Sequence, residues 1–159
     1  MSILRFLMFL SLGVWLGGIV LFSVLAPTAF SVLPSHFIAA MIVGPMLSKL
    51  HWMGIVAGII FLLCSIVLTK LADGRTEIVS AKNLLVSLML ISTCISQFSV
   101  MPKMAALRKS VGDIEQLSLT DPIRLHFDAL HVWSTRLEGG ILLLGLIVLY
   151  LSAQMRQPQ

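Results

Sequence analysis

The sequence is poor in charged residues and in cysteine. Asp, Glu, Lys and Arg make up 11% of its 159 residues, whereas roughly a quarter is usual in soluble domains. Its two cysteines, Cys64 and Cys94, both lie inside apolar stretches, where a cysteine usually acts as a small buried hydrophobe. The composition therefore excludes an ordinary water-soluble domain and a disulfide-linked scaffold.

Several motifs that carry chemistry are also missing. The sequence has no Gly-rich phosphate loop, no CxxC pair, no CxxCH haem-attachment motif and no arrangement that suggests a serine triad. It therefore assigns no catalytic residue and favours a non-enzymatic protein. The formal net charge is +4, but in so apolar a chain the basic residues serve topology and anionic lipid headgroups. We expect membrane lipids and no nucleic acid as partners.

Long apolar runs dominate the sequence. Hydrophobic residues make up 58% of the chain, the mean hydropathy is +1.01, and a helix needs about 20 mostly apolar residues to cross a bilayer. Four runs meet this length, at residues 6–26, 50–71, 82–100 and 130–153. The predicted fold is all-α: a single domain over residues 1–159, built as an up-and-down bundle of four transmembrane helices.

Two histidines mark one level of the predicted bundle. His51 precedes Leu71 by 20 residues, and His131 precedes Leu151 by 20 residues, which at 1.5 Å per residue is about 30 Å. We call this level face B, and expect residues 28–49 and 103–129 to form a helical cap there. Both termini and the turn at 69–82 then lie at the opposite end of the bundle, which we call face A. We expect a bacterial inner membrane protein whose termini are cytoplasmic, since the basic residues of face A adjoin the span ends.

Polar residues gather near face B on the fourth predicted helix. Asp128, His131, Thr135 and Glu138 are spaced by three, four and three residues, so they share one helix face. Polar groups are costly against hydrocarbon and should face the bundle interior. The predicted pocket consists of these four residues together with His51 and Gln97, which reach the same level. Asp128 is placed to accept a hydrogen bond from the ring of His131.

The sequence leaves the chemistry of this pocket open. His51 and His131 would suit haem b, copper or zinc as ligands. The histidines and carboxylates would equally suit a proton relay, and the layer would also suit the polar head of a lipid, quinone or drug-like amphiphile. A fourth interpretation is structural, because histidine and tryptophan are common at the headgroup level.

The positions of glycine and tryptophan predict where helices, or partner chains, pack against one another. Four glycines, Gly13, Gly17, Gly54 and Gly58, form two pairs with the four-residue spacing that lets helices approach closely. If the chain is a homo-oligomer or an accessory subunit of a larger membrane complex, the flanks of Trp15 and Trp133 are the predicted partner surfaces.

Several short motifs carry a resemblance to a known family. They are WLGG at 15–18, AP at 26–27, VGPMLSKLHWMG at 43–54, the stretch 101–108 that begins with Met-Pro, and FDALHVWS at 127–134. With them the chain resembles the transmembrane-protein-205-like family of small four-helix membrane proteins, whose bacterial members mostly carry a domain of unknown function. It departs from the family pattern at Val132, where members tend to have glycine, and at Glu138, near the position where members tend to have asparagine.

The resemblance implies a four-span fold. Through the drug and metal tolerance linked to eukaryotic members, it also implies the handling of small molecules, and it supplies no catalytic residues. Together with the residues, it predicts a small-molecule or ion handler, or an accessory subunit of a larger complex. The alternative is a haem- or copper-binding redox protein that uses His51 and His131.

Overall fold

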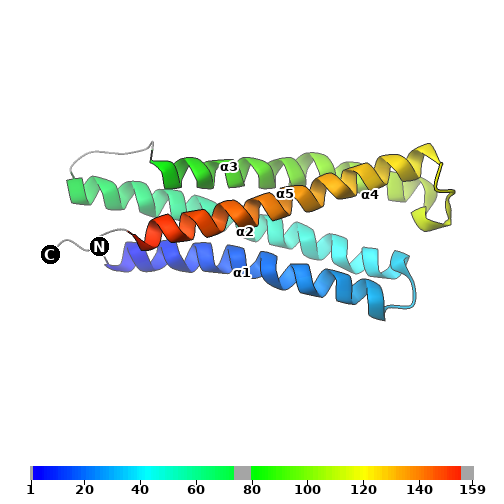
Figure 1. Cartoon of the computed structure of the whole chain (residues 1–159), viewed down its shortest axis with the longest axis horizontal. Helices are drawn as coiled ribbons and strands as arrows, with labels where there is room; N and C mark the ends of the chain where they lie inside the picture. Colours follow the sequence, from blue (N-terminus) through cyan, green and yellow to red (C-terminus); the bar gives the residue numbers. More distant parts are fainter. Residues whose placement is uncertain (1, 74–79, 155–159) are drawn as a thin grey trace.

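The computed structural model describes residues 2–73 and 80–154, and this part of the chain is helical without a strand. Figure 1 shows the helices as long antiparallel rods. Their bounds are α1 Ser2–Val32, α2 His36–Asp73, α3 Ala81–Ile95, η1 Ser96–Val100, α4 Met101–Val111, η2 Ile114–Gln116 and α5 Pro122–Ala153. The centre of the predicted turn at 69–82 lies outside the described residues.

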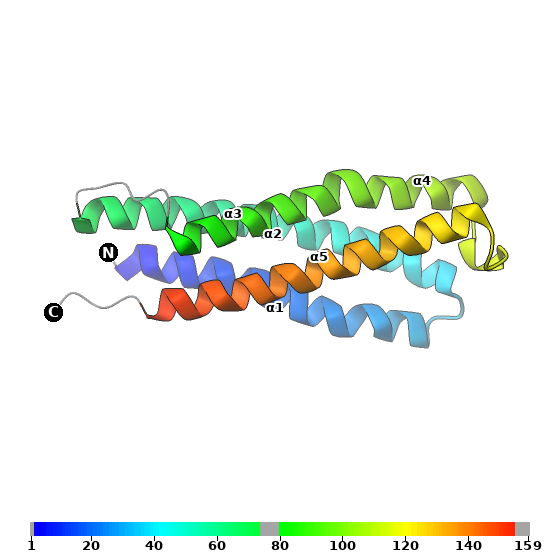
Figure 2. The same ribbon diagram turned by 45° about the horizontal axis from the view of Figure 1, so that its top comes forward.

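The rods form an up-and-down bundle. α1 packs against α2 and α5, and α3 packs against α2 and α5, while α3, η1 and α4 together form one continuous rod. Four helical segments of the described chain are long and apolar enough to cross a membrane. The start of α1 and the end of α5 lie at one end of the bundle, and η2 lies at the other (Figures 1 and 2). The predicted all-α fold is confirmed, and its four apolar helices indicate an integral membrane protein.

The helices extend well past the predicted spans. Each predicted span lies inside one rod, but α2 begins at His36, and α5 begins at Pro122. The start of α5 is set locally: the side chain of Asp121 accepts a hydrogen bond from Ile123 N, and Pro122 occupies the first turn, where its missing N–H costs nothing. α4 ends at Val111, and Gly112 caps it with a φ of 76°, which suits glycine better than any other residue.

The core lies in the half of the bundle toward face A. Apolar side chains from all four rods fill it, among them Met8, Leu12, Phe61, Met89 and Ile141. In one close contact between rods, a large residue packs against a glycine: Leu16 of α1 lies against Gly145 of α5.

Trp15 corrects one prediction about surfaces. It is buried in the core, with 2% of its surface exposed, so it is no partner surface. Its indole lies against Gly54 and Gly58, where an added Cβ at Gly54 would stand 2.4 Å from Nε1. These two glycines therefore allow α1 and α2 to approach each other closely.

The other predicted glycine pair, on α1, points away from the interior of the bundle. A Cβ at Gly13 or at Gly17 would meet nothing within 4 Å, because neighbouring large residues such as Leu12 and Leu16 occupy the inner side of α1. Gly18, which the sequence reasoning did not single out, is the α1 glycine that packs closely, against Leu50 and Met53.

One helical irregularity lies near face B. Residues Ser96–Val100 form a π-helical turn, in which the backbone N–H of Met101 donates to Ser96 O. Pro102 follows at once and has no N–H to give to an α-helical ladder. A widened turn accommodates the proline, and such turns often lie at functional sites. Gln97 lies within this turn.

Candidate functional site: the buried His51 network

His51 joins three helices through its side chain. It projects from α2 and is 1% exposed. Its Nδ1 lies 2.9 Å from Oε1 of Gln97 on η1, and its Nε2 lies 2.7 Å from Oε1 of Glu138 on α5. Gln97 in turn donates from Nε2 to Oγ of Ser48, at 2.9 Å, one helical turn before His51. Each polar atom of the imidazole therefore has a partner from a different rod.

The hydrogen-bond pattern indicates how many protons the pair shares. Because the amide nitrogen of Gln97 donates to Ser48, its oxygen faces His51, so Nδ1 carries a hydrogen. The short contact between Nε2 and Glu138 then needs one more proton, held either by the ring or by the carboxyl. In both forms the His51–Glu138 pair has no net charge. Gaining or losing a proton would leave a charge at a site that is largely closed to water.

The pair lies at the face-B edge of the apolar band. Lys49 and Arg136, each two residues from one member of the pair, are exposed, as charged side chains are at a membrane boundary. On the other side of Glu138 the fourth rod continues through buried Ile141 and Val148. Glu138 retains 15% exposure of its side chain, so it connects the buried ring with the surroundings.

The predicted single pocket is divided in two. Of its six residues, the structure brings together His51, Gln97 and Glu138. His131 and Asp128 are exposed and line a separate cavity further toward the cap. They share a helix face with Glu138, but His131 precedes Glu138 by seven residues, about 10 Å along the helix axis.

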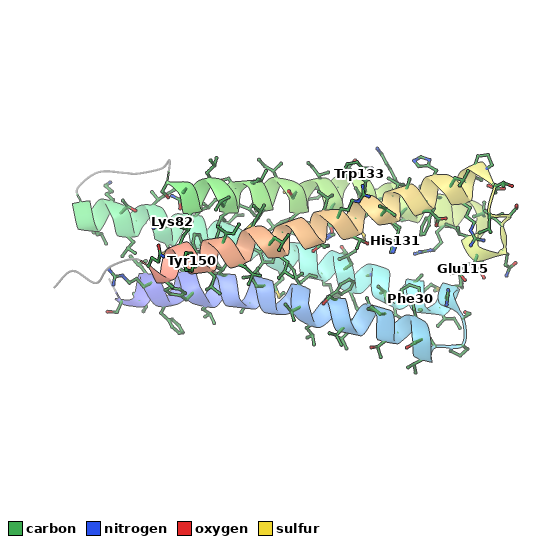
Figure 3. All side chains as sticks on the ribbon, viewed as in Figure 1. Phe30, Lys82, Glu115, His131, Trp133 and Tyr150 are labelled. Carbon is green, nitrogen blue, oxygen red and sulfur yellow. The ribbon has the colours of Figure 1, made fainter. Side chains whose placement is uncertain are left out.

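Two further details correct the predicted layer. Asp128 forms no hydrogen bond with His131 among the described contacts, and the carboxylate that orients a histidine is instead Glu138 on His51. Thr135 donates its hydroxyl to the carbonyl of His131 in its own helix, at 3.0 Å. Trp133 is 59% exposed. Figure 3 shows where His131 and Trp133 lie along α5.

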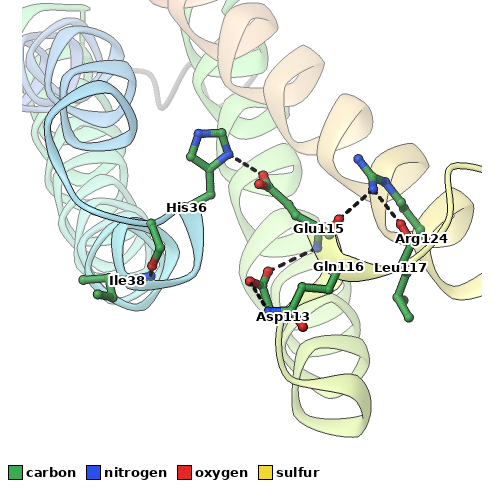
Figure 4. Close-up of polar contacts among 8 residues, drawn as sticks. His36, Ile38, Asp113, Glu115, Gln116, Leu117 and Arg124 are labelled. Carbon is green, nitrogen blue, oxygen red and sulfur yellow. Dashed lines mark hydrogen bonds and ion pairs between the residues drawn. The ribbon is translucent and has the colours of Figure 1, made fainter.

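A cavity of about 290 Å³ lies at the cap end, between the α1–α2 hairpin and the segment from α4 to α5. His36 of α2 and Glu115 of η2 close one side of it with a 2.5 Å contact between exposed side chains. Arg124 of α5 donates to the carbonyl oxygens of Glu115 and Leu117. Figure 4 shows how these contacts tie the cap together.

The arrangement does not fit haem or metal ligation by the two predicted histidines. Both ring nitrogens of His51 already have side-chain partners, and His131 lines the other cavity. The described residues contain no group of three His, Cys, Asp or Glu side chains placed to hold a metal ion.

Sequence reasoning missed some members of these sites. Ser48 could have been found, because it precedes His51 by three residues and so shares its helix face. The contact of His36 with Glu115 spans 79 positions, and no local pattern signals it.

Comparison with known proteins identifies the family. The family model described as a domain of unknown function, DUF4149, matches residues 10–112. The chain belongs to the DUF4149 family. The match covers α1 from its third turn through α4, and thus includes His51 and Gln97, while Glu138 on α5 lies beyond it. No curated protein and no solved structure matches this DUF4149 chain significantly.

Proposed function

We propose that this DUF4149 protein is an ion handler of the bacterial inner membrane, with its termini in the cytoplasm, and that the ion is the proton. The His51–Glu138 pair is its proton-binding element. One observation carries the proposal: Nε2 of an imidazole that is 1% exposed lies 2.7 Å from a carboxyl oxygen of another transmembrane rod. Ionisable residues in such positions are commonly functional, because they are costly to keep there.

Because the pair is buried, the number of protons that it holds determines whether a charge is left among the packed helices. With the shared proton the pair is neutral, and a second proton or the loss of the first leaves one charge among the packed helices. A charge in a poorly solvated site costs several kcal/mol unless it is paired. Protonation would therefore alter the contact between α2 and α5, and a conformational change can be driven in this way.

The surroundings support access from face B. On α5 the polar stripe continues from Glu138 toward the cap through Thr135 and His131. In the other direction the buried core of the described residues contains no Asp, Glu, Lys, Arg or further His. A proton would therefore enter and leave on the same side, which suits a binding and coupling site better than a channel.

The family resemblance supports the same class of function. Membership of the transmembrane-protein-205-like family is part of this proposal, and it agrees with small-molecule handling. A second candidate function, an accessory subunit or homo-oligomer, is favoured by the outward-facing Gly13 and Gly17, whose spacing suits close helix contact. Trp133 would belong to such a surface, since it is exposed.

Charge movement after a pH jump tests the proton proposal. Vesicles that contain the protein in one orientation are adsorbed on a solid-supported membrane, and the pH on the face-B side is stepped. We expect a brief current from proton binding, which is lost in Glu138→Gln and in His51→Gln. Glu115→Gln is the matched control, because it breaks the exposed His36–Glu115 pair instead. A steady current would contradict one-sided access, and an unchanged transient in Glu138→Gln would refute the proposal.

A further inference from the structure

The cap cavity contains unengaged groups of both charges. Several of its ionisable lining residues are engaged within the protein: His36 with Glu115, Arg124 with two carbonyl oxygens, and Asp113 with the backbone N–H of Glu115. The side chains of Arg108, Asp128 and His131, which also line the cavity, form no hydrogen bond or ion pair with any described residue, although the charge of Asp113 acts on Arg108. One guanidinium, one carboxylate and one imidazole thus remain available in a single cavity.

Arg108 is positioned by an aromatic ring. Its guanidinium carbon lies over the ring of Phe127, 5.1 Å from the ring centre, and its N–H groups donate to no described residue. Arginine in this arrangement keeps its charge and offers a rigid fork to phosphate or carboxylate. The neighbouring Asp128 offers the opposite charge, which an ammonium group would match.

The remaining walls of the cavity are apolar and aromatic. Phe30, Phe37, Ala40, Ile114 and Phe127 contribute to them. A purely ionic, freely soluble ligand would gain little from such walls, whereas the polar head and glycerol region of an amphiphile would fit both kinds of surface.

The outer surface beside the cavity indicates where the ligand's apolar part would lie. Leu125 and Val132 on α5, directly after the cavity-lining Arg124 and His131, are large apolar residues left exposed. Acyl chains can cover these residues while the head enters the cavity. This combination favours a lipid over a free zwitterion.

We propose that the cap cavity binds the zwitterionic head of a phospholipid that carries a primary ammonium group, as a phosphoethanolamine lipid does. The phosphate lies on Arg108, and the ammonium group donates to Asp128. This site is separate from the His51–Glu138 pair, and it does not depend on the proton proposal.

Lipid binding to the purified full chain tests the assignment. Native mass spectrometry in detergent would compare phosphatidylethanolamine, phosphatidylcholine and phosphatidylglycerol with matched acyl chains. We expect phosphatidylethanolamine to bind about tenfold more tightly than the other two, since charge-assisted hydrogen bonds of this kind are each worth at least a factor of ten. Phosphatidylcholine has no N–H to donate, and phosphatidylglycerol has no ammonium group.

Matched variants separate the two contacts. Arg108→Gln should weaken both phosphatidylethanolamine and phosphatidylglycerol, whereas Asp128→Asn should remove only the preference between them. Lys109→Gln removes one charge from an exposed neighbour and should change neither, and Glu138→Gln should leave lipid binding intact. Equal binding of the three lipids, a preference that survives Arg108→Gln and Asp128→Asn, or equally strong competition by soluble phosphoethanolamine would overturn the proposal.

Discussion

Nε2 of His51 lies 2.7 Å from Oε1 of Glu138, although the two residues are 87 positions apart in the chain. This contact joins α2 to α5 at the level where the bundle meets face B. Its carboxylate is only 15% exposed and its imidazole 1% exposed, so neither partner can turn readily to water when the other is removed.

Loss of one partner should therefore destabilise the bundle. We expect His51→Leu or Glu138→Leu to lower the free energy of unfolding by about 1 to 3 kcal/mol, the usual cost of leaving a buried polar partner unsatisfied. Unfolding of the detergent-solubilised protein by sodium dodecyl sulfate measures this. The double variant should lose less than the sum of the two single variants, because the unpaired group is then absent. Strict additivity would show that the two side chains do not act as a pair.

The exposed pair at the cap provides a contrast. His36 and Glu115 are also in contact, but their side chains are 53% and 54% exposed. Glu115→Leu should lower the free energy of unfolding by less than about 1 kcal/mol, as is usual for surface ion pairs. A loss as large as that of Glu138→Leu in the same titration would mean that the cap contact supports the whole fold.

His131 should tolerate substitution. The sequence groups it with Glu138 and so predicts a destabilising His131→Leu change, but the structure leaves its ring exposed and without a side-chain partner. We expect His131→Leu to stay within about 0.5 kcal/mol of the parent protein, as surface substitutions do. His126→Leu, also exposed on α5, is the control in the same unfolding titration. A loss above 1 kcal/mol at His131 alone would support the sequence-based prediction that His131 and Glu138 belong to one buried polar pocket.

The glycines on α1 and α2 should respond differently to alanine. At Gly54 an added Cβ would stand 2.4 Å from Nε1 of Trp15, and at Gly13 it would meet nothing within 4 Å. Gly54→Ala should destabilise the monomer by about 1 to 3 kcal/mol through overpacking. Gly13→Ala should be neutral or slightly stabilising in the monomer, since alanine favours a helix over glycine. If Gly13→Ala instead weakens an oligomer in cross-linking experiments, α1 is an interface between chains.

Labelling of single cysteines tests the membrane topology. In a background without Cys64 and Cys94, cysteines at Ser2 and Gln154 should react with an impermeant maleimide from one side, and a cysteine at Ser110 from the other. In intact cells we expect Ser110→Cys alone to react, because the termini are proposed to be cytoplasmic. Reaction of Ser2→Cys and Ser110→Cys from the same side would contradict the four-span arrangement.

The sequence by itself determined the four-helix fold, because each apolar run is long enough to cross a bilayer and helices satisfy their own backbone there. Counting residues at 1.5 Å each placed His51 at the depth of His131, whereas the structure pairs it with Glu138, about 10 Å further along α5. Only the tertiary structure decided which side chains meet. The rotation of each rod about its axis depends on packing such as Trp15 against Gly54 and on the π-helical turn before Pro102. Residue spacing along one helix contains neither, so it could not show that His51 pairs with Glu138 while His131 lines the cap cavity.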